Sequence, residues 1–298
     1  MSAGHDHGAH DMSDSRLLWA VVVNVGLTVA QIIGGIVSGS LALIADALHN
    51  FSDAASLGLA LFARKIGRRP ADKLMTFGYG RAEIVAALIN LTTLVIIGLY
   101  LLIEAVSRYF DPQPVEGWTV VIVAGIALAI DVATAVLVHK GTKGSLNIKA
   151  AFLHNVSDAL ASVGVIIAGT LIVLYGLYIA DLVMTAAIAA YVLYQGLSLL
   201  PKTVKLLMDA VPDDVEFDAI LRQLEAVEGV ASVHHLHIWN LDEHRRALEA
   251  HLVPVHATIA EFELLKARVR KRLLEHHSIE HATLEPCVAD DGGGAGCD

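Results

Sequence analysis

The sequence predicts a polytopic α-helical membrane protein that ends in a water-soluble α+β domain. Its 298 residues are 55% hydrophobic and only 17% charged, with a mean hydropathy of +0.59, which is far more apolar than an ordinary soluble domain. The apolar residues gather in six segments, each long enough to cross the roughly 30 Å hydrocarbon core of a bilayer as a helix. After about residue 202 the pattern changes to short amphipathic helices and strands.

These patterns divide the chain into four parts. Residues 1–15 form a polar, His-rich tail that lacks the basic start and cleavage site of a secretory signal. Residues 16–201 form the membrane domain, residues 202–288 the water-soluble domain, and residues 289–298 a disordered tail. The six helical spans are expected at 16–37, 41–63, 82–106, 118–138, 151–175 and 179–200.

The basic residues of the loops predict the orientation. The connections after the second, fourth and sixth spans are rich in Lys and Arg, whereas the opposite loops hold only Arg108. Because cytoplasmic loops carry the basic residues, both termini are expected in the cytoplasm. The two cysteines then face a reducing compartment, and we expect no disulfide. A net charge of −10 argues against nucleic acid as a partner.

One pentad, His-Asn-x-Ser-Asp, occurs twice, at residues 49–53 and 154–158, each time within an apolar span. On a helix, His49 and Asp53 share one face, as do His154 and Asp158. Ionisable groups at membrane depth normally face a partner inside the bundle. Together the two pairs offer two nitrogens and two carboxylate oxygens, a set that suits tetrahedral Zn(II) and also Cd(II) or Co(II). Such a site is electrically neutral with one M(II) or with two protons, which suits a protein that exchanges the two. The alternative is that the pentads only form hydrogen-bonded contacts between helices.

Other polar residues of the spans leave alternatives open. Asp46 lies on the same helical face as the first pair and is expected to support the ligands or to relay protons. Asp131 is an isolated intramembrane acid, either a proton carrier or a buried hydrogen-bonding group. Asn24, Gln31 and Asn90 are interpreted as contacts between helices. Because each half of the membrane domain has three spans, the second and fifth helices run in opposite directions, as in carriers that work by alternating access.

The water-soluble part predicts the order αββαβ. A helix capped by Asp213 or Asp214 is followed by a hairpin of two strands, 230–241 and 245–254, then by a capped helix over 258–277 and a strand over 279–286. This order suggests a small open-faced α+β sandwich. The domain is rich in histidine without a zinc-finger spacing. At the other end of the chain, His5, His7 and His10 form either a metal-collecting tail or a merely polar terminus.

The two His-Asp pairs, the segment PADKLMTFGYGRAE at 70–83 and the tail VHHLHIW...HATLEPC resemble the cation diffusion facilitator family of zinc transporters over nearly the whole chain. The resemblance implies a homodimer with cytoplasmic ferredoxin-like domains, located in a bacterial inner membrane. It also implies that this homodimer exports Zn(II) in exchange for protons. It assigns transport ligands to His49, Asp53, His154 and Asp158. For a second metal site, in the cytoplasmic domain, the resemblance assigns the ligands His234, His251 and Glu285.

The resemblance also indicates what is missing. Some bacterial members carry another metal site after the second span, built from an Asp and two His. This chain offers Asp72, with Met75 and Tyr79 in place of the histidines, so we expect that site to be lost or weak.

The sequence thus predicts an antiporter rather than an enzyme, with no cofactor and with Zn(II) as substrate and as a candidate structural or regulatory ion. An intramembrane metalloenzyme would need an open coordination position and a base, typically H-E-x-x-H, which is absent. A channel needs weaker binding than a tetrahedral site gives. A metal-sensing membrane protein without transport is the alternative.

Overall fold

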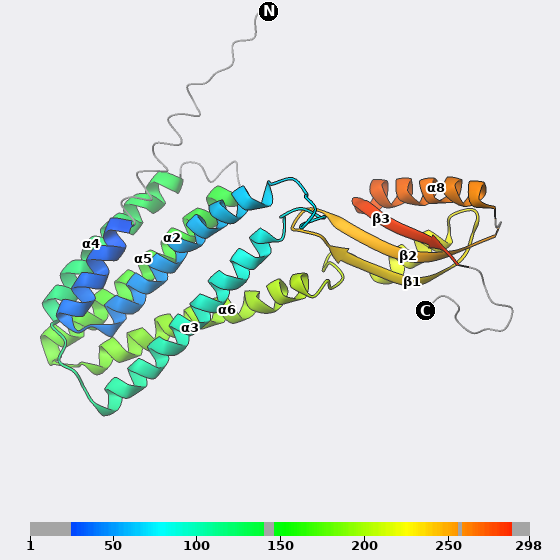
Figure 1. Cartoon of the computed structure of the whole chain (residues 1–298). Coiled ribbons are helices and arrows are strands. Elements are labelled where there is room, and N and C mark those ends of the chain that lie inside the picture. The colour runs from blue at the N-terminus through cyan, green and yellow to red at the C-terminus, as the bar shows by residue number, and fades with distance from the viewer. Residues whose placement is uncertain (1–24, 140–145, 256–257, 288–298) are drawn as a thin grey trace, which may run out of the picture. The chain divides into compact units, whose positions relative to one another are not determined.

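A computed structural model describes residues 25–139, 146–255 and 258–287 (Figure 1). The described residues form two compact units, one within the ranges 1–59 and 90–199, the other within the ranges 60–89 and 200–298. The segment 60–89 therefore belongs to the same unit as the water-soluble domain. The predicted tails at 1–15 and 289–298 lie outside the described residues.

Long helices make up the membrane part. Val25–Ser38 is a shorter apolar helix, and five long helices follow: α2 Leu41–Gly67, α3 Ala82–Phe110, α4 Gly117–His139, α5 Leu146–Tyr175 and α6 Ile179–Leu207. By length and composition four of them can cross a membrane, namely α3, α4 (over Gly117–Val136), α5 (over Phe152–Tyr175) and α6. Six spans are thus not confirmed: of the first predicted span, 16–37, the structure describes only the residues from 25 on, and α2 carries the polar pentad His49–Asp53.

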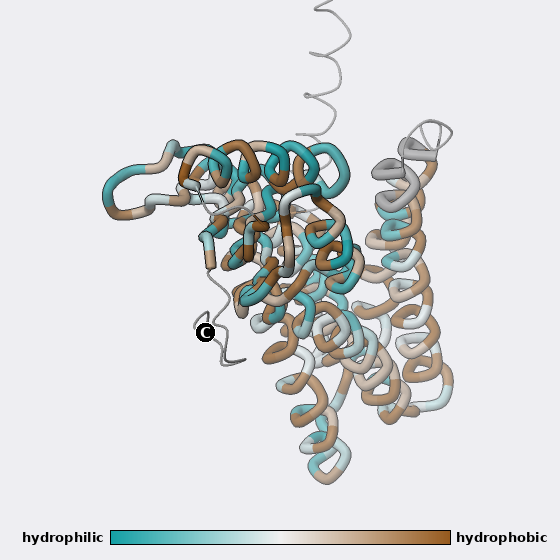
Figure 2. Tube along the Cα trace, turned by 90° about the vertical axis from the view of Figure 1, so that its right-hand side faces the viewer, coloured by the Kyte–Doolittle hydropathy of each residue, from teal (hydrophilic) through white to brown (hydrophobic). Residues whose placement is uncertain are grey.

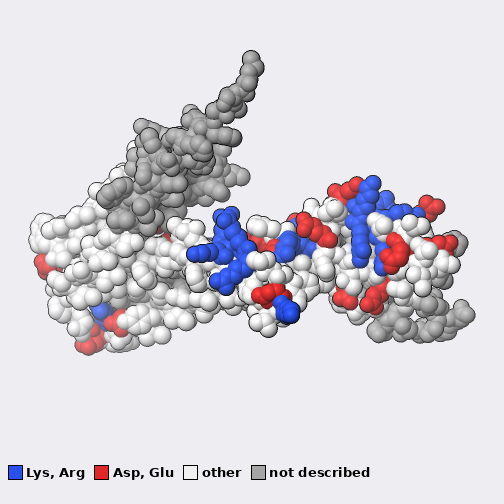
Figure 3. Space-filling view, turned by 45° about the horizontal axis from the view of Figure 1, so that its top comes forward, with Lys and Arg blue, Asp and Glu red and all other residues white. Residues whose placement is uncertain are grey.

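Small residues let these helices approach each other closely. Ala42, Ala45, Ala124 and Ala189 are buried in one core with leucine, isoleucine and valine side chains. α4 packs along α5, and a Cβ added at Gly169 would lie only 3.0 Å from Val120 Cγ1. Such small contacts are typical of helix packing in membranes. The long helices are hydrophobic along their length (Figure 2), and Figure 3 shows few charged side chains over the helices of the first unit.

The water-soluble domain has the predicted order αββαβ. It consists of α7 Phe217–Glu225, β1 Val230–Asn240, β2 Arg246–Pro254, α8 Ile259–His277 and β3 Ile279–Pro286. β2 lies in the centre of the sheet, antiparallel to β1 and parallel to β3. Both helices share one core with the strands, in which Leu248, Leu252 and Val269 are completely buried. The α+β sandwich predicted from the sequence is confirmed.

Two local predictions are wrong. α7 begins after Glu216, which makes no side-chain capping bond; Asp214, one of the two expected caps, instead binds Arg246. The guanidinium of Arg246 offers a carboxylate a stronger, charge-assisted hydrogen bond than a helix end does. Cys287, buried at the end of β3, is disulfide-bonded, contrary to the expectation; the chain's other cysteine, Cys297, lies outside the described residues. The cap predicted for α8 is present, because Thr258 accepts a bond from the Glu261 N–H.

Candidate metal centre

α2 and α5 bring the two pentads together. Nε2 of His49 lies 3.6 Å from Asp53 Oδ2 on its own helix and 3.7 Å from Asp158 Oδ1 on α5. Nε2 of His154 lies 3.4 Å from Asp53 Oδ2 and 3.5 Å from Asp158 Oδ2. Each imidazole thus faces one carboxylate from each helix, as the spacing of four residues predicts.

These distances suit one tetrahedral ion. Ligand atoms about 2.0 Å from a zinc ion lie roughly 3.3 Å from one another, so atoms 3.4–3.7 Å apart need only small movements to bind it. His49, Asp53 and Asp158 place ligand atoms within 4.8 Å of one another, the only such cluster of three or more among the described residues. His154 is not part of this cluster, and its ring centre lies 6.4 Å from that of His49, so His154 would have to move closer to complete a set of four ligands. Asp53 Oδ2 and Asp158 Oδ1 are buried without a hydrogen bond, which a bound cation would satisfy.

A second layer of amides supports the ligands. Gln31 donates a bond of 2.6 Å to Asp46 Oδ2, and Asn50 donates one of 3.1 Å to Gln31 Oε1. Asn50 belongs to the first pentad, so this chain of bonds ties the ligand-bearing turn of α2 to the Val25–Ser38 helix. Gln31 and Asp46 are almost completely buried. The sequence predicts Gln31 as a contact between helices, and its bonds are of that kind.

Asp131 joins the same buried region from α4. Its Oδ2 accepts a bond of 3.2 Å from the Ser162 hydroxyl on α5. Asp46 lies close enough to Asp131 and Asp158 for their charges to interact, and Ser162 also reaches Asp46. Asp46 and Asp131 therefore lie near Asp158, one of the residues of the metal cluster. The sequence carries no signal for Ser162, because a lone serine in an apolar helix usually bonds to its own backbone.

The centre lies where α2 passes from buried to exposed. From Leu41 to Asn50 every side chain of α2 is buried or half-buried, whereas Phe51 is 54% and Leu57 49% exposed. The ligands divide in the same way. The side chains of His49 and Asp158 are 3% and 8% exposed, but that of His154 is 46% exposed. The centre thus lies between a more exposed C-terminal half of α2, where the basic loop begins, and a buried N-terminal half, which we call the closed half.

In the loop after α2, where the sequence predicts a metal site to be lost or weak, the Asp72 carboxylate accepts hydrogen bonds from the loop itself. Asp72 Oδ1 accepts bonds of 2.8 Å from the N–H groups of Leu74 and Met75, and Oδ2 accepts one of 2.6 Å from the Tyr79 hydroxyl. The bond from Tyr79, followed by the two backbone bonds, holds the pKa of Asp72 below its usual value. With Met75 and Tyr79 in place of histidines, the loop offers a metal ion one carboxylate that already has three donors.

Two histidines and a glutamate of the water-soluble domain lie in one row across the sheet. His234 of β1 is paired with His251 of β2, which is paired with Glu285 of β3, and His251 Nε2 lies 3.7 Å from Glu285 Oε2. The ring of His234 bonds to Ser232 Oγ at 3.0 Å. His235, to which the sequence assigns no ligand role, has a positive φ of 50° in a bulge of β1 and stacks on His251 with ring centres 4.8 Å apart.

Helices of this length around a buried cluster of nitrogen and carboxylate ligands define an integral membrane protein with a metal site. Comparisons with known proteins identify the family. The description "Cation efflux transmembrane domain" matches residues 17–208, and "Cation efflux protein, cytoplasmic domain" matches residues 212–287. The chain belongs to the cation efflux family.

Three relatives illustrate the match. The chain is 35% identical to the "Cadmium, cobalt and zinc/H(+)-K(+) antiporter" of Bacillus subtilis, over 95% of this chain and 91% of that one. It is 36% identical to the "Metal cation efflux system protein CzcD" of Cupriavidus metallidurans, over 98% and 93% of the two chains. It is 33% identical to the "Zinc transporter ZitB" of Escherichia coli, over 98% and 95%.

Proposed function

We propose that this protein is a proton-coupled antiporter that exports Zn(II), and also Cd(II) or Co(II), from the cytosol by alternating access. The observation that carries the proposal is the cluster of His49, Asp53 and Asp158, whose ligand atoms lie within 4.8 Å of one another, with His154 Nε2 3.4 Å and 3.5 Å from the two carboxylates. The names of the relatives, which mention zinc, cadmium, cobalt and protons, support the same substrates.

Charge balance explains the exchange. The two aspartates supply two negative charges, so one M(II) leaves the ligand set neutral and lowers the cost of holding an ion at membrane depth. Two protons achieve the same neutrality. Because imidazole and carboxylate must lose protons before they bind metal, protons that reach the site compete with the ion and release it.

The burial pattern of α2 supports a direction of transport. The more exposed half of α2 leads into Arg64, Lys65, Arg68 and Arg69, and basic loops face the cytoplasm. We therefore assign this side to the cytosol and the structure to the state that loads the ion. Both termini then lie in the cytoplasm, and the bacterial relatives suggest the inner membrane.

Asp46 and Asp131 are proposed as the proton relay. Neither belongs to the four ligands, yet both are buried and share Ser162 as a hydrogen-bonding neighbour. This arrangement would give protons a route to Asp158 without a water-filled channel through the closed half.

The other histidines are proposed to bind metal outside the membrane. In the cytoplasmic domain, His234, His251 and Glu285 would bind a regulatory or structural Zn(II), and the domain would pair two copies of the chain. His5, His7 and His10, which lie outside the described residues, would collect metal for the transport site.

The decisive experiment is zinc flux in proteoliposomes. Purified wild type and Asp158→Ala are reconstituted with an internal zinc-sensitive dye, and a pH gradient is imposed. Zinc movement that follows the proton gradient and vanishes in Asp158→Ala supports the proposal. Unchanged flux in the variant would remove the site assignment. Zinc binding without flux in the wild type would show a sensor instead.

A further inference from the structure

A buried aspartate at the start of α6 holds the first turn of α2. Asp181 is 1% exposed. Its Oδ1 accepts a bond of 2.5 Å from the Ser40 hydroxyl, and its Oδ2 accepts bonds of 2.8 Å and 3.2 Å from the N–H groups of Leu41 and Ala42. The first N–H groups of a helix lack partners within the helix, and negative charge is favoured there. Asp181 thus caps a helix to which it does not belong.

Neighbouring contacts clamp the same short segment. Arg108 of α3 donates a bond of 2.7 Å to the Gly39 carbonyl, and the N–H of Glu116 donates one of 2.8 Å to the Ser38 carbonyl. Gly39 has a φ of +73°, and a Cβ there would lie 2.7 Å from the Pro114 carbonyl oxygen, so this position requires glycine. Residues 38–42 are therefore fixed to α6, to α3 and to the connection between α3 and α4.

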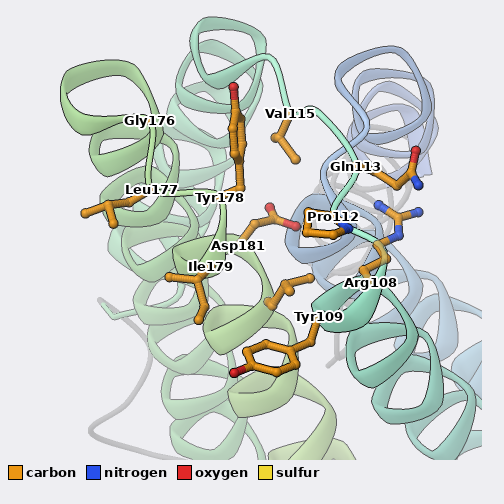
Figure 4. Close-up of a pocket in the computed structure, with 11 residues that line it drawn as sticks. Arg108, Tyr109, Pro112, Gln113, Val115, Gly176, Leu177, Tyr178, Ile179 and Asp181 are labelled. Carbon is orange, nitrogen blue, oxygen red and sulfur yellow. The ribbon is translucent and has the colours of Figure 1, made fainter.

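The clamp lies on the closed side of the metal centre. Leu41 precedes His49 by about 12 Å along the helix, at about 1.5 Å per residue, and α2 is buried or half-buried over this whole stretch. Beside the clamp is a cavity of about 450 Å³, lined by Asp181 together with Arg108, Tyr109, Pro112 and Tyr178. Figure 4 shows the Asp181 carboxylate directed toward the side of the cavity where Arg108 and Pro112 lie.

We propose that Asp181 is the latch that closes the metal centre toward this cavity, and that it must release the start of α2 before the ion can leave on that side. Asp181 is a positioning residue, since it reaches His49 and Asp53 only through α2. The inference rests on the proposed transport function, because a protein that only binds metal has no need to open a second side.

A cysteine reporter tests the latch without relying on flux. Ala45, 1% exposed on the closed half of α2, is replaced by cysteine, and a membrane-impermeant maleimide is added to right-side-out vesicles. The chain without the reporter gives the background labelling, to which Cys287 does not contribute while it is disulfide-bonded. In the Asp181→Asn variant we expect labelling about tenfold faster than with Asp181 intact, because bonds to a charged group favour one state by at least that factor. Zinc affinity at the metal centre should stay unchanged.

The matched control is Thr185→Val, which removes another buried hydroxyl one turn along α6. Thr185 Oγ1 bonds to the Asp181 backbone carbonyl, at 2.8 Å, and not to α2, so labelling should keep its original rate. An unchanged labelling rate in Asp181→Asn would overturn the latch, as would equal acceleration by Thr185→Val. If Asp181→Asn does not fold, Ser40→Ala should give a smaller acceleration in the same direction, and no acceleration there would also overturn it.

Different experiments test the latch and the transport function. Absence of zinc flux in the wild type would refute the transport function. The labelling rates would still decide whether Asp181 closes this side of the centre.

Discussion

His49 Nε2 and Asp158 Oδ1 lie 3.7 Å apart although they belong to different helices, α2 and α5. Both side chains are almost completely buried, and Asp158 Oδ1 has no hydrogen bond. A histidine and a carboxylate in this arrangement would be costly in an apolar bundle unless something else joined them. A divalent cation, or protons in its place, would supply that connection.

The first prediction concerns charge at the centre. Asp53→Asn keeps the shape of the side chain but leaves one negative charge to face the two positive charges of the ion. We expect zinc affinity to fall by more than about a hundredfold, beyond the 10–100-fold typical of an outer partner. Competition with a chelator on the detergent-purified protein measures it. Asp111→Asn, in the exposed connection after α3, is the matched control, and an equal loss there would argue against a local charge effect.

The second prediction separates metal binding from proton coupling. Asp46→Asn keeps a polar group of the same size beside Gln31, but it cannot carry a proton. Zinc affinity should change by less than about tenfold, since Asp46 is not one of the four ligands, whereas zinc flux should lose its dependence on the imposed pH gradient. Zinc-dye flux at several gradients tests this. A variant that still follows the gradient as the wild type does would exclude Asp46 from the relay.

The third prediction concerns the cytoplasmic row of histidines. In an Asp158→Ala background, which removes the transport site, zinc should still bind to the domain through His251 and Glu285, which lie 3.7 Å apart. Adding His251→Ala should lower the number of bound ions by one per chain, while His244→Ala, in the turn between β1 and β2, should leave it unchanged. Equilibrium dialysis gives the number of ions bound. An unchanged number in His251→Ala would place the cytoplasmic ion elsewhere.

Sequence reasoning reaches the ligands because repetition is visible in one dimension. His49, Asp53, His154 and Asp158 share a spacing of four residues, and helix geometry turns that spacing into one face. The order αββαβ is equally accessible, since its elements differ in hydrophobic period. Asp181 cannot be assigned in this way. It stands alone at the start of an apolar helix, and its partners are N–H groups of α2, which carry no sequence signal.

Competing bonds explain the other differences. Asp214 resembles a helix cap in sequence, but the Arg246 guanidinium, brought close by the fold, binds it instead. His235 looks like any surface histidine of a strand until the bulge in β1 turns it onto His251. In both cases the role of the side chain depends on a residue from another part of the chain. The local sequence pattern is therefore not enough to predict that role.

The fourth prediction is a pH dependence in the turn between β1 and β2. Burial opposes the charge of Asp242, but bonds from the N–H of His244 and from Arg245 outweigh it and hold the pKa of Asp242 below 3.8. A carboxyl whose pKa is lowered on folding stabilises the fold above its ordinary pKa, and this contribution is lost as the pH falls through the lowered value. Asp242→Asn should therefore unfold more easily than the wild type at pH 7, and the difference should vanish in strong acid.

Urea unfolding of the full chain in detergent, followed at several pH values, measures this difference. Glu280→Gln, an exposed acid on β3, is the control and should show little difference at any pH. A constant difference between Asp242→Asn and the wild type across the whole range would mean that the side chain acts through shape rather than through charge.

The fifth prediction concerns how the loop between α2 and α3 meets the turn between β1 and β2. A Cβ added at Gly80 would lie 2.5 Å from Asp242 Oδ2 and 2.7 Å from Asp242 Cβ, so that the turn itself would have to move. Asp242 cannot swing aside freely, because it also holds Arg245, whose guanidinium donates to the Phe77 carbonyl of the loop. Gly80→Ala should therefore cost about 1–3 kcal/mol of unfolding free energy, as overpacking usually does.

Gly125→Ala, where a Cβ would meet nothing within 4 Å, is the matched control and should be neutral or slightly stabilising in its helix. Urea unfolding compares the two variants, and an equal stability of both would show that the loop does not rest on Asp242.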